Sequence, residues 1–98
     1  MRTSPTQEQL QGVFALLRVV LKSLEETRGN VSMTNVPILG GTVADIRARH
    51  DGSPGMSWWS LELDLGNGDP WKAVGDTPQA AARDIWWELC KESEMFEN

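Results

Sequence analysis

The stretch TVADIRARHDGSPGMSWWSLELDL, residues 42–65, decides the fold because apolar and polar residues alternate in both of its halves. Alternation with a period of two is typical of a strand that buries one side. The segment DGSPG between the halves, residues 51–55, has the composition of a turn. Two strands joined by a short turn pair antiparallel, so we predict a hairpin with strands at about 42–50 and 58–65.

One register of this hairpin turns the apolar sides of both strands toward the same core. It places Arg47 opposite Glu62, and Asp45 near Asp64, on the other face of the sheet. The sequence therefore predicts a sheet with one buried face and one solvated face of mixed charge.

The adjacent tryptophans of the second strand must point to opposite faces of the sheet, because consecutive strand residues alternate. The apolar side of that strand includes Trp59, which we assign to the core together with the leucines that follow it. Trp58 is then predicted on the open face, beside Glu62 or at the edge of the sheet. A slip of one residue in the register would reverse the two tryptophans.

A helix is predicted before the hairpin, at about residues 5–28. The segment SPTQ at its start, residues 4–7, resembles a capping box with proline in the first turn. Leu16 and Val19 fall outside the apolar face. The predicted core face, with apolar residues at intervals of three and four, comprises Leu10, Val13, Phe14, Leu17, Val20, Leu21 and Leu24.

Two shorter strands are predicted on either side of the hairpin, at about residues 31–36 and 70–75. The segment VSMTNV alternates Val31 and Met33 with polar residues before PILGG ends the run. Trp71 opens the last strand, and we expect it to close the core from the edge of the sheet.

A second helix is predicted at about residues 78–93, with Thr77 as its N-cap and Pro78 in its first turn. In helical projection Trp86 borders the core stripe, whereas Trp87 points away from it. The stripe itself comprises Ala82, Ile85 and Leu89.

These elements predict an α+β fold in a single domain, residues 1–98, with an N-terminal helix, a three- to four-stranded antiparallel sheet and a C-terminal helix. The chain has room for one domain of ordinary size. Each helix has one apolar face and so does the sheet. We therefore expect both helices to pack on the same face of the sheet.

The composition excludes several classes of function. Fourteen acidic and nine basic residues give a net charge of −5, which disfavours non-specific binding to nucleic acid. One cysteine and one histidine provide neither an internal disulfide nor a spacing of metal ligands, so no metal and no other cofactor is expected. The sequence shows no secretion signal and no apolar run of membrane-spanning length, so we expect a cytoplasmic location without membrane contact.

Catalysis is not expected, although two residues raise the question. His50 and Asp51 are neighbours, but adjacent strand residues diverge, and the nearby serines lie in the turn without an activating partner. Cys90 lies on the flank of the C-terminal helix beside Trp86, where burial would make its thiol inert. The sequence therefore favours binding over enzymatic activity.

Trp87 is the first candidate for a binding contact, because tryptophan is strongly enriched at interface hot spots. Arg83, Lys91 and Glu94 are its neighbours on the helix and complete the predicted surface. Two alternatives stay open: the cations fold over the ring, or the surface binds a partner, including a second copy of the chain. A second candidate surface, on the open face of the sheet, comprises Trp58, Glu62 and Asp64.

The order helix, three strands, helix, with WKAVGDTPQAAARDIWWEL at residues 71–89, is similar to the topology of double-stranded-RNA-binding domains. In that family the second helix begins with lysines that contact phosphates. Here the corresponding residues 75–79 contain Asp76 and no lysine, so RNA binding is not carried over. A nucleic-acid-binding domain of this type that uses Arg47 and Arg49 is kept as the alternative function.

The segment GDTPQAAARDI, residues 75–85, also resembles small phage and prophage proteins with an α-β-α sandwich layout. The resemblance implies a virus or mobile-element origin and a bacterial host, and compact acidic proteins of this kind often dock on host proteins. We therefore expect a non-enzymatic module that binds a host protein or defence complex, for example as an inhibitor in an anti-CRISPR-type role. Its acidic surface would be attracted to a basic groove that normally holds nucleic acid.

Overall fold

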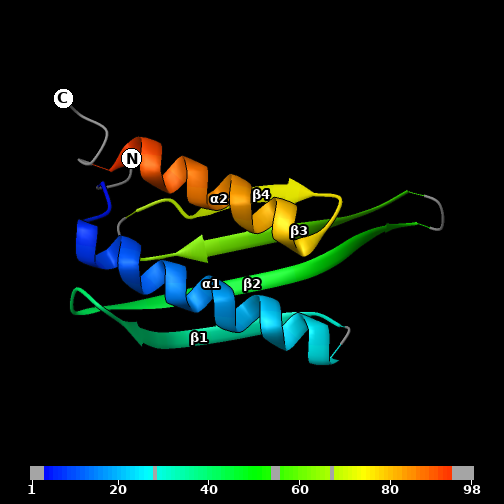
Figure 1. Cartoon of the computed structure of the whole chain (residues 1–98), viewed down its shortest axis with the longest axis horizontal. Helices are drawn as coiled ribbons and strands as arrows, with labels where there is room; N and C mark the ends of the chain where they lie inside the picture. The colour runs from blue at the N-terminus through cyan, green and yellow to red at the C-terminus, as the bar shows by residue number, and fades with distance from the viewer. Residues whose placement is uncertain (1–3, 28, 54–55, 67, 94–98) are drawn as a thin grey trace.

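The computed structural model describes residues 4–27, 29–53, 56–66 and 68–93 of the chain. In chain order its elements are α1 (Gln7–Thr27), β1 (Val31–Ile38), β2 (Thr42–Ser53), β3 (Met56–Asp64), β4 (Trp71–Gly75) and α2 (Pro78–Glu92). The four strands form one antiparallel sheet in the order β1-β2-β3-β4, and both helices lie across the same face of it (Figure 1). The predicted α+β fold is confirmed. Within the described ranges, neither helix is long and apolar enough to cross a membrane.

The hairpin of β2 and β3 is longer than predicted. Pairing continues to Ser53 in β2 and begins at Met56 in β3, so the hairpin projects beyond the two helices (Figure 1). Trp59, which pairs with His50 near this projecting end, packs against the core but is only half-buried. β1 also runs further than predicted, through Pro37, which an edge strand tolerates because one side of its backbone is unpaired.

The predicted register of the hairpin is confirmed. Arg47 pairs with Glu62, and Asp45 pairs with Asp64. The apolar side of both strands faces the helices, and the residues on it that are buried are Ala44, Ile46, Ala48, Leu61 and Leu63. The opposite face carries the charged side chains and is not covered by a helix (Figure 1).

The N-terminal cap of α1 differs from the one that SPTQ predicts. The N–H of Gln9 donates to Thr6 Oγ1 at 3.1 Å, and the N–H of Thr6 donates to Gln9 Oε1 at 2.9 Å, so these two residues form the capping box. The side-chain Nε2 of Gln9 also donates to Thr42 Oγ1 at 2.8 Å. This bond joins the start of α1 to the start of β2, and such a long-range contact cannot be read from the local sequence.

Phe14 and Leu16 occupy positions opposite to those that the helical spacing predicts. The spacing places Phe14 in the core, but its side chain is 49% exposed; it places Leu16 outside the core, but that side chain is 5% exposed. The cause is that α1 contacts β1 on one flank and α2 on the other. Leu16 is covered on the β1 flank, whereas Phe14 and Trp86 pack in a T-shaped arrangement, with 5.3 Å between ring centroids.

Gly12 allows α1 to approach the end of β1 closely. A Cβ atom at this position would lie 2.8 Å from Ile38 Cβ and 2.8 Å from the backbone nitrogen of Leu39. Glycine inside a helix costs about 1 kcal/mol relative to alanine. Its presence in α1 is therefore explained by packing and not by helix propensity.

Replacement of Gly12 by alanine is expected to lower the free energy of unfolding by about 1–3 kcal/mol, because the added methyl group overpacks the contact with β1. Urea denaturation followed by circular dichroism measures the change. Gln11→Ala, at the exposed neighbouring position, is the control and should change stability by no more than about 0.5 kcal/mol. A more stable Gly12→Ala variant, as helix propensity alone would give, would show that α1 and β1 are not in tight contact here.

Candidate functional site

The two edges of the sheet differ in how open they are to another strand. β1, at one edge, contains a bulge between Met33 and Val36, and Asn35 in this bulge has a φ of 54°. The N–H of Asn35 donates to Asp45 Oδ1 at 2.7 Å, and Pro37 further along β1 has no N–H to offer. Bulges and prolines are devices that protect an edge from pairing, so the β1 edge is guarded.

β4, at the opposite edge, presents the backbone groups of Lys72 and Val74 outward. The direction of these backbone groups can be derived from β2. The backbone N–H of His50 in β2 donates to Asn30 Oδ1, so it points toward β1 and away from β3. Backbone groups alternate in direction along a strand, and the β2-β3 and β3-β4 registers run without a shift. Every second residue of β4, beginning with Trp71, therefore bonds to β3, and the N–H and C=O groups of the residues between them point away from the sheet.

A groove follows this edge between β4 and α2, and it is termed the β4 groove. It has a volume of about 490 Å³ and is lined by Pro70, Trp71, Lys72, Ala73, Val74, Asp84, Trp87 and Glu88. Trp87 is 56% exposed and Val74 is 59% exposed. Trp87 projects from the helix that covers one face of the sheet, and Val74 lies on the other face, so these apolar side chains flank the edge from both sides.

The predicted exposure of Trp87 is confirmed, but its surroundings differ from those predicted. The α2 wall of the β4 groove consists of Asp84, Trp87 and Glu88, and the described residues that line the groove do not include Arg83 or Lys91. Lys91 Nζ lies instead 3.0 Å from Glu88 Oε1. Because α2 packs beside β4, the residues on the β4 side of Trp87 form the wall, and Arg83 is exposed outside it.

The second predicted surface is not compact. Trp58 is 40% exposed on the open face, as predicted. Glu62 and Asp64 follow it along β3 at about 13 and about 20 Å, the reach of an extended strand of that length. Glu62 Oε2 lies 3.5 Å from Lys72 Nζ, so its charge is engaged away from Trp58. Glu94, predicted beside Trp87, lies outside the described residues.

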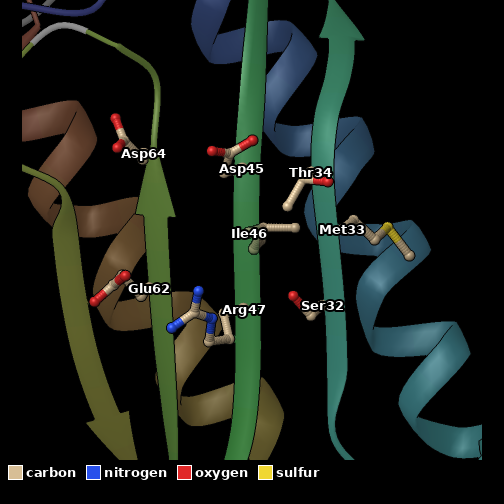
Figure 2. Close-up of a pocket in the computed structure, with 8 residues that line it drawn as sticks. All are labelled: Ser32, Met33, Thr34, Asp45, Ile46, Arg47, Glu62 and Asp64. Carbon is tan, nitrogen blue, oxygen red and sulfur yellow. The ribbon is translucent and has the colours of Figure 1, made fainter.

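A shallow hollow on the open face holds the facing carboxylates of Asp45 and Asp64, and Arg47 reaches from β2 toward β3 beside them (Figure 2). Each aspartate accepts a backbone N–H, at 2.7 Å from Asn35 for the first and at 2.8 Å from Gly66 for the second. These hydrogen bonds reduce the repulsion between the two acids. In the part of the chain that the structure describes, no three acidic, histidine or cysteine residues are grouped to hold a metal ion.

Arg47 and Arg49, the residues of the nucleic-acid alternative, lie together with Lys72 around a second hollow of about 190 Å³ on the open face. Glu62 lines the same hollow, opposite Arg47 in the register and 3.5 Å from Lys72 Nζ. This carboxylate offsets part of the positive charge, and the whole chain carries −5. The hollow keeps an excess of basic side chains, whereas the net charge of the whole chain opposes long-range attraction of a phosphate backbone.

His50 and Cys90 both have packing roles in the structure. The His50 ring lies at a tilt on the ring of Trp59, with 5.0 Å between their centroids. Cys90 is buried, and desolvation by burial raises the pKa of its thiol. A raised pKa lowers the fraction of thiolate that could attack a substrate.

Sequence reasoning missed most of the β4 groove. Lys72 and Val74 belong to the segment WKAVG, whose pattern indicates a strand but does not say that the strand lies at an edge. Asp84 and Glu88 could have been found, because they lie three residues before and one residue after Trp87 on the same helix. Which flank of the helix meets β4 depends on the packing, and only the structure shows it.

Comparison with known proteins gives no relative from which a site could be transferred. No protein-family model matches the chain, and neither a curated protein nor a solved structure matches it. The candidate site is therefore defined by the geometry of the chain alone.

Proposed function

We propose that the protein is a non-enzymatic protein-binding module that accepts an extended segment of a partner polypeptide along β4. The observation that carries the proposal is the outward direction of the Lys72 and Val74 backbone groups beside the exposed ring of Trp87. An added strand would form backbone hydrogen bonds at this edge and cover the ring. Recognition by strand addition takes its affinity from the main chain and its specificity from the pockets for alternate side chains.

The two sides of an added strand would meet different surroundings. Its residues on the helix side face Trp87, which lies between the carboxylates of Asp84 and Glu88 in the wall of the groove. Its residues on the open side face Val74 and Lys72. We therefore expect an alternating partner segment with apolar or basic residues on the helix side, where tryptophan can act as an anchor.

The narrower role, an inhibitor that docks on a host defence complex, is supported by the net charge of −5 and by the phage-like segment at residues 75–85. A negatively charged protein is attracted to a basic surface over a long range, and this attraction raises the association rate more than the affinity. In this role the host complex would have to offer an accessible extended segment to β4.

Selection from a displayed library of random peptides tests strand addition without a known partner. Val74→Pro removes an outward N–H, so it should weaken binding of the selected peptides by about tenfold or more. Val74→Ala keeps this N–H and is the matched control for the side chain, and it should lose clearly less affinity than Val74→Pro. Isothermal titration calorimetry makes the comparison. Equal binding to Val74→Pro and to the wild type would rule out strand addition at β4.

A further inference from the structure

We infer that the strand that pairs with β4 is supplied by a second copy of the same chain. The two copies pair their β4 strands antiparallel about a twofold axis at Ala73, so that the two sheets join and the two α2 helices lie side by side. This inference rests on the proposed function, because it names the occupant of the same edge.

The residues of β4 favour this register. A twofold axis at Ala73 is the one that overlaps the whole strand, Trp71–Gly75, with its symmetry mate. It pairs Lys72 with the partner's Val74, and both have outward N–H and C=O groups, so each pair exchanges two hydrogen bonds. An axis at Lys72 would place this residue opposite the partner's Lys72, and like charges directly opposite each other are destabilising.

Asp84 and Lys91 on α2 are complementary under the same axis. Glu88 lines the groove near the axis, and Lys91 Nζ of its own helix, 3.0 Å from Glu88 Oε1, offsets its charge. Ala73 and Trp87 line one groove, so an axis at Ala73 passes beside Trp87, where the two α2 helices run antiparallel. Asp84, one turn before Trp87, then faces the partner's Lys91, one turn after it, and symmetry repeats the contact. Within the described part of the chain Asp84 makes no ion pair, so its carboxylate is available for this contact.

Pairing of the two β4 strands also closes the assembly. It covers Trp87 and Val74, which are 56% and 59% exposed in the single chain, and it uses the open edge of each sheet once. The outer edges of the joined sheet are then the two β1 strands, which the bulge at Asn35 and Pro37 guard against further pairing. Association through β4 therefore ends at two copies.

Sedimentation equilibrium of the full chain over a wide range of concentrations tests the inference, and the wild type is expected to form a reversible dimer. Asp84→Lys should raise the dissociation constant by about tenfold or more, because two attractive contacts become repulsive. Adding Lys91→Asp to this variant restores opposite charges, and the constant should return to within about threefold of the wild type. Arg83→Glu reverses a charge on the other side of Trp87 from Asp84 and Lys91 around the helix, and it should leave the constant unchanged.

A wild-type protein that stays monomeric at every concentration would overturn the inference. So would a dimer that Val74→Pro and the charge reversals leave intact. These failures are distinct from failure of the proposed function. The wild type could be monomeric and bind the selected peptides while Val74→Pro does not bind them. This result would show that β4 accepts a strand from another protein and not from a second copy. If peptide binding is also insensitive to Val74→Pro, both proposals are wrong.

Discussion

Replacement of Trp71 by alanine is expected to lower the free energy of unfolding by about 3–5 kcal/mol. Trp71 is 2% exposed and is one of the largest fully buried side chains, so its removal leaves a cavity between β4 and the rest of the core. Its Nε1–H also donates to Glu92 Oε2 at 2.8 Å, which joins β4 to the last turn of α2. Chemical denaturation followed by far-ultraviolet circular dichroism measures the loss.

Two further variants separate the causes of this loss. Trp71→Phe keeps much of the apolar volume but removes the hydrogen-bond donor, and it should cost about 1–2 kcal/mol. Trp58→Ala removes a tryptophan that is 40% exposed on the open face, and it should cost about 1 kcal/mol or less. Equal losses at the two tryptophans would contradict the assignment of Trp71 to the core and of Trp58 to the open face.

The register of β2 and β3 could be predicted from residues 42–65 because it is the one that turns both apolar sides toward the core. The exposure of Trp87 could be predicted because the cap fixes the start of α2: the N–H of Ala80 donates to Thr77 Oγ1 at 3.1 Å. In both cases the deciding information is local or comes from one pair of adjacent strands.

The phase of α1 and the open edge could not be predicted, because both depend on how distant elements pack. The apolar residues of α1 cover a wider arc than one neighbour can bury, so the contacts with β1 and α2 decide that Leu16 is buried and that Phe14 is exposed. The segment WKAVG indicates a strand, but the order of the strands makes it an edge. The β4 groove then depends on where α2 lies relative to that edge.

Proline substitutions at two adjacent positions of β4 are expected to differ sharply in their effect on the free energy of unfolding. Ala73→Pro should lower the free energy of unfolding by about 3 kcal/mol or more, because the Ala73 N–H bonds to β3 in the pair with Leu61. Val74→Pro should cost about 1 kcal/mol or less, because the Val74 N–H points away from the sheet. Urea denaturation of both proteins measures the difference.

Ala73→Val and Val74→Ala are the controls for side-chain volume, because each keeps the backbone N–H that the proline at the same position removes. The comparison tests the direction of the β4 backbone, on which both the strand-addition proposal and the dimer depend. A Val74→Pro variant that is less stable than Ala73→Pro would mean that Ala73, and not Val74, presents its backbone to a partner. With the expected result, Val74→Pro is a folded protein with a blocked edge, so loss of peptide binding or of dimerisation in this variant cannot be attributed to unfolding.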